Sequence, residues 1–151
     1  MNVICFHNPD EENGYLSNWY LSDFTVDGVK FTSMEQYMMY RKAICFHDSD
    51  IDIDAQILKT SDVAQIKALG RLVRNYDDHH WNGVRQIVIY EGLKAKFSQN
   101  PDLLKMLKDT RDALLAECAV KDRIWGIGLS MTAPTDLTDL NGTARICLDM
   151  H

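Results

Sequence analysis

The sequence predicts one α+β domain in which helices predominate and the strands are few and short. Apolar residues recur at helical spacing over several long segments, whereas the runs that favour a strand span only a few residues. No Pro-, Gly- or Ser-rich linker, internal repeat or low-complexity tract interrupts the 151 residues, so we expect a single domain over residues 1–151. A content of 46% hydrophobic and 25% charged residues is typical of a globular chain with a substantial core.

The first predicted elements are short strands. Val3–Phe6 favours a strand. Phe24–Val26 and Val29–Phe31 favour the two arms of a hairpin. Asp27-Gly28, the dipeptide between them, is a strong signal for a tight turn.

Three helices follow the hairpin. Ser33 and Gln36 fit a capping box, with Ser33 as N-cap, and predict a helix from Met34 to about Cys45. The acidic segment 48–54 indicates a helix start, because carboxylates are favoured at the positive end of the helix dipole. A further short helix begins at Ser61-Asp62 and ends at Gly70.

The second half begins with the longest predicted helix, from about Asp78 to Phe97. Asn100-Pro101 starts the next helix, with proline at the first helical position. Periodicity does not distinguish a strand from a helix over Leu114–Val120, whereas Ile124–Leu129 favours a strand that leads into a loop. The tail from residue 130 is polar and rich in turn residues, with an uncertain last element at 144–150.

Charge and cysteine content exclude several classes of protein. The net charge of −6 disfavours a non-specific polyanion binder but allows a local basic pocket for one phosphate. The first residues lack a signal peptide and no apolar run is long enough to span a membrane, so we expect a cytoplasmic protein with no membrane partner. The four cysteines form no CxxC pair, so we expect free thiols and no metal site.

The helix over 34–45 breaks its own amphipathic pattern. Glu35 and Lys42 are seven residues apart and lie on one face, about 10 Å apart along the axis, with Met38 and Met39 between them. If this stripe faces the core, burial raises the pKa of the carboxyl and lowers that of the amine, which suits acid–base or nucleophilic chemistry. If the stripe faces solvent, the Glu35 carboxylate interacts favourably with the positive end of the helix dipole, and the Lys42 side chain extends into water. The spacing alone leaves both readings open.

Other residues have a structural and a functional interpretation. Asn18 and Trp19 lie in a loop that could bind a base or sugar or could simply cover the edge of a core. His79-His80 suggests a metal site, but the side chains of adjacent helical residues point about 100° apart and no third ligand is evident. Trp81 fits a core position.

Two further segments could contact phosphate. Asp122 precedes Trp125-Gly126-Ile127-Gly128, whose glycines would let backbone N–H groups approach a phosphate while the tryptophan stacks on a base. A tight turn beside a core tryptophan explains the same residues. Arg71, after a helix end, could contact phosphate or remain a surface charge. The chain has no P-loop, GxGxxG, nucleophile elbow or HExxH motif.

Taken in order, these motifs form a familiar set. They are Tyr15-Leu16-Ser17-Asn18-Trp19, Phe24, Asp27-Gly28, Phe31, Ser33-Met34-Glu35-Gln36-Tyr37-Met38, Lys42-Ala43, Leu69-Gly70-Arg71, Trp81, Arg85, Ala95-Lys96-Phe97, Asn100-Pro101, Leu107, Thr110 and Asp122-x-x-Trp125-Gly126-x-Gly128. Over about residues 5–130 the chain resembles the NADAR superfamily of YbiA-like proteins, which is linked to NAD and ADP-ribose metabolism and contains N-glycosidases.

The resemblance implies a mostly helical α+β fold and hydrolysis of an N-glycosidic bond between a ribose phosphate or ADP-ribose and an amine or base. The implied partner is a small nucleotide-like substrate: a ribosylamino-pyrimidine phosphate of riboflavin synthesis or an ADP-ribosyl conjugate of guanine. ADP-ribosylated nucleic acid is a further candidate, and no cofactor is implied. The residues that match the catalytic positions are Glu35, Lys42 and Asp122. Those that match substrate-binding positions are Asn18, Trp19, Tyr37, Arg71, Trp81, Trp125 and Gly126.

The end of the chain departs from the family pattern. Relatives finish with Leu-Gly and a short helix, whereas this chain reads Asn141-Gly142-Thr143-Ala144-Arg145-Ile146-Cys147-Leu148-Asp149-Met150-His151. The divergent tail keeps one alternative to an enzyme open, a non-catalytic ADP-ribose or nucleotide-binding module. A structural or interaction protein is a third class, in which Glu35 and Lys42 would tolerate alanine.

Overall fold

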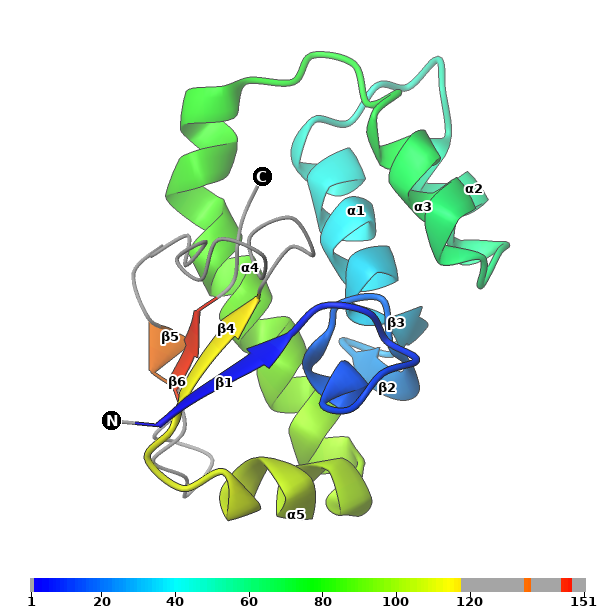
Figure 1. Ribbon diagram of the computed structural model, residues 1–151. Coiled ribbons are helices and arrows are strands. Elements are labelled where there is room, and N and C mark those ends of the chain that lie inside the picture. Colours follow the sequence, from blue (N-terminus) through cyan, green and yellow to red (C-terminus); the bar gives the residue numbers. More distant parts are fainter. Residues whose placement is uncertain (1, 118–134, 137–144, 148–151) are drawn as a thin grey trace. The chain divides into compact units, whose positions relative to one another are not determined.

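The computed structural model describes residues 2–117, 135–136 and 145–147 (Figure 1). The described elements, in chain order, are β1 (Val3–Phe6), η1 (Gly14–Leu16), β2 (Leu21–Val26), β3 (Val29–Ser33), α1 (Met34–Cys45), α2 (Ile53–Leu58), α3 (Val63–Gly70), α4 (Asp78–Gln99), α5 (Pro101–Asp109), β4 (Leu114–Glu117), β5 (Thr135–Asp136) and β6 (Arg145–Cys147). This confirms the α+β class with predominant helices. Contacts divide the chain into two compact units, residues 21–99 and the two segments on either side of them.

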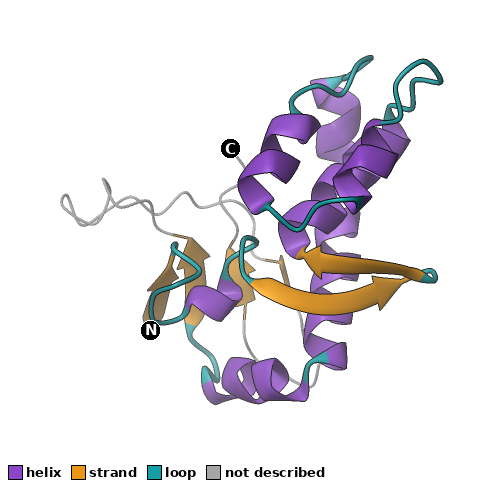
Figure 2. Ribbon diagram, turned by 90° about the vertical axis from the view of Figure 1, so that its right-hand side faces the viewer, coloured by secondary structure: helices purple, strands orange, loops and turns teal. Residues whose placement is uncertain are grey.

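The unit of residues 21–99 begins with the predicted hairpin, whose antiparallel strands lie beside the helices in Figure 2. Asp27 and Gly28 have φ angles of 50° and 81°. Positive φ at both central residues is the requirement of the hairpin turn that matches the twist of the strands. Phe24 pairs with Phe31 across the hairpin, and their ring centroids are 5.9 Å apart.

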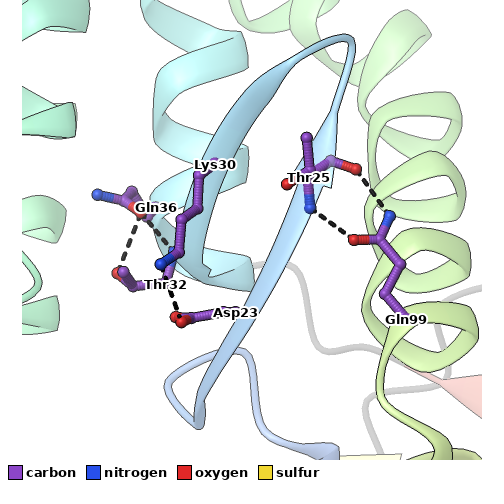
Figure 3. A network of polar contacts seen from close by, with 6 residues as sticks. All are labelled: Asp23, Thr25, Lys30, Thr32, Gln36 and Gln99. Atoms are coloured by element: carbon purple, nitrogen blue, oxygen red, sulfur yellow. Dashed lines mark hydrogen bonds and ion pairs between the residues drawn. The ribbon is translucent and has the colours of Figure 1, made fainter.

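The helix α1 begins where the capping motif predicts. The Ser33 hydroxyl accepts a hydrogen bond from the Gln36 backbone N–H at 3.1 Å. In a capping box the side chain at the third position returns to the backbone N–H of the N-cap. Here it reaches one residue further back, and Gln36 Oε1 accepts from the Thr32 N–H at 2.7 Å (Figure 3). The predicted range Met34–Cys45 is confirmed.

The helix α1 is central to its unit and packs against α2, α3 and α4. A small apolar core lies between α1, α2 and α3. The buried members of this core are Ala43, Ile53, Ile57 and Ile66. On another side, α1 and α4 approach closely at Gly92, where a Cβ would lie 2.5 Å from Tyr37 Cδ1. Any side chain at Gly92 would therefore force these two helices apart.

The helix α4 extends two residues beyond the predicted end. Its last residue, Gln99, pairs with the hairpin, since its side-chain amide donates to the Thr25 carbonyl and accepts from the Thr25 N–H, both at 2.8 Å (Figure 3). This pair of bonds satisfies both backbone groups of one strand residue and joins the hairpin to the end of α4.

The same helix buries a lysine. Lys96 is 0% exposed, and burial lowers the pKa of its amine to about 7, from the ordinary value of 10.5. Between these two values the unfolded chain holds a proton on this amine that the folded chain has released. The folded state therefore gains stability as the pH rises through this window.

We expect Lys96→Met, which keeps the length of the side chain and removes the amine, to be more stable than the wild type at pH 7. This advantage is expected to shrink by about 1.4 kcal/mol per pH unit toward pH 9.5, because one proton separates the two states. Urea unfolding across this range measures the effect. Lys105→Met, at an exposed lysine of α5, is the matched control. The prediction would be contradicted if the free energies of unfolding of the wild type and Lys96→Met changed in parallel with pH.

The second unit holds a sheet with the strand order β1-β4-β6-β5. β4 lies parallel to β1, with Leu115 opposite Ile4, so Leu114–Glu117, the described part of the segment that periodicity left ambiguous, is a strand. β6 falls within the uncertain last element at 144–150. α5 begins as predicted with Pro101 in its first turn. The strand predicted over Ile124–Leu129 lies outside the described residues.

One expectation about the cysteines is wrong. Cys5 is disulfide-bonded, whereas Cys45 is a free thiol. Sequence spacing did not reveal the bond, because a disulfide needs only that folding bring two distant cysteines within a few ångströms. None of the described helices combines the length and the apolar character that crossing a membrane would require.

Candidate functional site

The helix α1 turns its Glu35–Lys42 stripe toward the protein interior. Glu35, in the first turn, is only 8% exposed, and Lys42, two turns later, is half-buried. Met38 and Met39 between them are also partly buried. Of the two orientations that spacing left open, the inward one is therefore correct, because α2 and α3 pack on α1, with contacts at Met39 and Lys42.

The Glu35 carboxyl lies among cations. Burial raises its pKa above the ordinary value, and the positive charges of Lys67, Lys42 and Arg71 oppose that rise without cancelling it. Lys67 and Arg71 are four residues apart on and just after α3, so they share one face of that helix. The result is a carboxyl that holds its proton to a higher pH than an exposed glutamate, inside a locally basic environment.

The Lys42 amine is held by two neighbours. Its Nζ donates a hydrogen bond to the Gly70 carbonyl at 2.9 Å and lies 4.6 Å from the centroid of the Tyr76 ring. Burial lowers the pKa of this amine, and the negative charge of Glu35 partly opposes the effect. Burial therefore favours the neutral form of the amine, which is the nucleophilic one.

Gly70 allows α3 to end close to α1. A Cβ at this position would overlap the sulfur of Met39, so a larger residue would require the Met39 side chain to move. The close approach brings the Gly70 carbonyl within hydrogen-bonding distance of Lys42. The sequence predicted Gly70 only as the end of a helix.

An aromatic cluster adjoins the Lys42 amine. The Phe46 ring, just after α1, makes edge contacts with Tyr76 at 5.3 Å, His80 at 5.8 Å and Trp81 at 6.4 Å between centroids. Trp81 is buried in this cluster, and it thus lies near Lys42 through Phe46 and Tyr76. His80 packs as an aromatic ring here.

The structure does not bring Tyr37 to this group. Tyr37 follows Glu35 by two residues and so lies about 200° around the helix from it. Its hydroxyl accepts from Arg41 at 2.6 Å and lies 3.3 Å from the Glu91 carboxylate, to which Arg41 also donates. These residues line a separate hollow of about 380 Å³ between α1, the hairpin and Glu91 of α4.

Asn18 and Trp19 belong to the other unit and follow η1. Both are partly buried, and the backbone N–H of Trp19 donates a hydrogen bond to the Ser17 hydroxyl at 3.1 Å. The Asn18 side-chain oxygen is buried and accepts no hydrogen bond within the part of the chain that the structure describes. Asp122, Trp125 and Gly126 lie outside the described residues, so their expected roles stay predictions.

Sequence reasoning missed three contributors to the site, namely Lys67, the Gly70 carbonyl and Tyr76. The four-residue spacing of Lys67 and Arg71 was a usable signal, since it places two cations on one helical face. A backbone carbonyl carries no sequence signal. Tyr76 lies in the connection between α3 and α4, after Asn75 with a φ of 58°, and no local pattern indicates where such a loop directs a ring.

Comparisons with known proteins find similarity over most of the chain. A family model described as the NADAR domain matches residues 5–144. An N-glycosidase of Acanthamoeba polyphaga mimivirus is 36% identical over 135 residues, which cover 84% of this chain and 78% of that protein. A riboflavin biosynthesis protein of Vibrio vulnificus is 34% identical over 125 residues, but this chain spans only 33% of its length.

A solved structure also matches. The NMR structure of the Escherichia coli protein YbiA superposes with a TM-score of 0.68 at 27% identity and covers 82% of this chain and 71% of that one. The N-glycosidase YbiA of Escherichia coli likewise aligns at 27% identity over 126 residues. The family model spans most of the chain, and on that ground the protein belongs to the NADAR domain family.

Proposed function

We propose that this protein is an N-glycosidase that hydrolyses the bond between a ribose phosphate or ADP-ribose and an amine or base. The observation that carries the proposal is the Glu35–Lys42 pair, a buried carboxyl and a half-buried amine on the inward face of one helix. The names of two relatives, both N-glycosidases, support the same reaction class.

Glu35 suits the transfer of a proton to the departing nitrogen. Breaking an N-glycosidic bond leaves positive charge on the ribose, and the base departs more easily once its nitrogen is protonated. Burial raises the pKa of Glu35, so its carboxyl remains a proton donor closer to neutral pH. Asp122 is the proposed partner that stabilises the positive ribose as a carboxylate.

Lys42 suits attack on the anomeric carbon. Its lowered pKa leaves more of the amine neutral, and a neutral amine forms a bond to that carbon while the bond to the base breaks. The bond between the anomeric carbon and the ring oxygen then breaks, a proton passes from Nζ to that oxygen, and the opened sugar is held as a protonated imine on Nζ. Water hydrolyses the imine and releases the sugar. The lysine passes its extra proton to Glu35, which replaces the proton that the base kept. The net reaction consumes one water and requires no cofactor.

The surroundings favour a phosphorylated substrate. Lys67 and Arg71 place positive charge around Glu35 even when the Lys42 amine is neutral, in a chain whose net charge is −6. A ribosylamino-pyrimidine phosphate and an ADP-ribosyl conjugate of guanine both carry phosphate. The name of the Vibrio vulnificus relative, a riboflavin biosynthesis protein, supports the ribosylamino-pyrimidine phosphate as the substrate. Further proposed substrate contacts come from Asn18, Trp19, Trp81, Trp125 and Gly126.

The test is release of base, followed by chromatography with mass detection, from three substrates in parallel. They are the ribosylamino-pyrimidine phosphate, an oligonucleotide with ADP-ribosylated guanine, and NAD. Glu35→Gln is expected to slow release about a hundredfold, because the amide is not a useful proton donor. The wild-type rate should fall as the pH rises through the pKa of Glu35.

Glu12→Gln, the same change at an exposed position, serves as the matched control and should leave the rate unchanged. Turnover that Glu35→Gln does not slow would remove Glu35 from the reaction. Folded wild-type protein that binds ADP-ribose tightly but releases no base from any substrate would overturn the enzyme proposal in favour of a binding module.

A further inference from the structure

We propose that Tyr76 is a positioning residue that holds the Lys42 amine against the Gly70 carbonyl, ready for reaction. The inference deepens the proposed function and rests on it. It concerns a residue in the connection between α3 and α4, outside every motif that the sequence singled out.

The first observation is the cradle around the amine. The Lys42 Nζ lies 4.6 Å from the centroid of the Tyr76 ring and 2.9 Å from the Gly70 carbonyl oxygen. An ammonium within about 6 Å of an aromatic face is attracted by the negative face of the ring. A carbonyl and a ring face therefore restrict the end of a side chain that has four rotatable bonds and is otherwise mobile.

The second observation is that the ring is itself anchored. The Tyr76 hydroxyl donates to Asp78 Oδ1 at 2.8 Å, where α4 begins, and the Phe46 ring contacts the Tyr76 ring at 5.3 Å between centroids. Burial and the Asp78 carboxylate raise the pKa of the phenol, so it stays protonated and keeps this bond. Tyr76 is nonetheless 42% exposed, so its ring lies at the surface and not in the buried core.

The charges that act on this group come from several elements. Glu35, on the same helix, favours the charged amine. Lys67 and Arg71 act on Glu35, and Asp77, Asp78 and Arg85 act on Tyr76. Against this background the ring face adds a further preference for the ammonium and fixes the direction of its approach.

Two variants separate the ring face from the hydroxyl. Tyr76→Phe loses the bond to Asp78 but keeps the ring and its contact with Phe46, so base release should stay within about threefold of the wild type. Tyr76→Leu keeps an apolar group over the amine but removes the ring face. It should lower kcat roughly tenfold with little change in KM, because a misplaced nucleophile slows chemistry more than binding. This loss of position is expected to outweigh the larger neutral fraction of the amine that a lower Lys42 pKa gives.

A second measurement does not depend on turnover. Titration of the Lys42 side chain, followed by NMR of its Cε and assigned with Lys42→Arg, reports its pKa in each variant. Leucine still excludes water but no longer stabilises the charged form of the Lys42 amine. The pKa of Lys42 should therefore fall in Tyr76→Leu and stay unchanged in Tyr76→Phe.

The outcomes are distinct. The positioning role is supported if both the Lys42 pKa and kcat fall in Tyr76→Leu and neither falls in Tyr76→Phe. Equal values in the wild type and Tyr76→Leu overturn it. If the wild type releases no base, the proposed function fails, and the titration still decides whether Tyr76 holds the amine.

Discussion

Replacing Lys42 with methionine is expected to slow base release about a thousandfold or more and to leave the fold intact. Methionine preserves the length of the side chain on α1 and removes only the amine. The Gly70 carbonyl then loses its donor at 2.9 Å, a change that costs about 1 kcal/mol of stability at a half-buried position. The catalytic loss should therefore far exceed the structural one.

Borohydride trapping identifies the chemistry behind that loss. An imine between Lys42 and the opened sugar should be reduced to a stable adduct, and mass spectrometry should locate it on Lys42 in the wild type. Lys42→Arg keeps the positive charge but cannot act as a neutral amine, so it should be as inactive as Lys42→Met if Lys42 is the nucleophile. Substantial activity in Lys42→Arg would mean that Lys42 binds phosphate as a cation.

Lys105→Met, at an exposed lysine, is the matched control and should trap and turn over substrate like the wild type. An adduct that persists in Lys42→Met would contradict the prediction, and so would the absence of any adduct during wild-type turnover. Chemical unfolding of each variant confirms that a loss of rate is not a loss of fold.

Replacing Gln36 with methionine is expected to lower the free energy of unfolding by about 3 to 5 kcal/mol. The buried Gln36 amide uses both its oxygen and its nitrogen. Its oxygen accepts from the Thr32 N–H at 2.7 Å and from the Thr32 hydroxyl at 3.0 Å. Its nitrogen donates to the Ile57 carbonyl at 3.0 Å and the Thr60 carbonyl at 2.9 Å. Methionine has a similar shape but leaves all four of these groups without their partner.

The measurement is urea unfolding of Gln36→Met beside Gln86→Met, the same change at an exposed position of α4. The control should change stability by no more than about 0.5 kcal/mol. A loss in Gln36→Met below about 1 kcal/mol would show that water replaces the amide at little cost. Because Gln36 adjoins Glu35 on α1, the variant is also expected to lose activity as the connection to α2 loosens.

The local elements were predictable because short-range chemistry decides them. A hydroxyl at Ser33 that caps its own helix, a dipeptide at Asp27-Gly28 that accepts positive φ, and Pro101 in a first helical turn each act within about four residues. The class of the fold followed from these signals.

Other features depended on partners far along the chain. Leu114–Glu117 could have been a helix or a strand until it paired with β1, more than 100 residues away in sequence. The disulfide of Cys5 had no local signal, and the choice of Ile57 and Thr60 as partners of Gln36 came from the packing of α2 on α1.

That Glu35 and Lys42 share a face of one helix follows from their spacing alone, since seven residues make two turns. The tertiary structure turns this face inward, because the core of α2 and α3 packs against it, and burial rather than spacing shifts the pKa values of both groups. It also decided which groups meet the amine. The Gly70 carbonyl and the Tyr76 ring reach Lys42 from 28 and 34 residues further along the chain, a distance over which no periodicity in the sequence carries information.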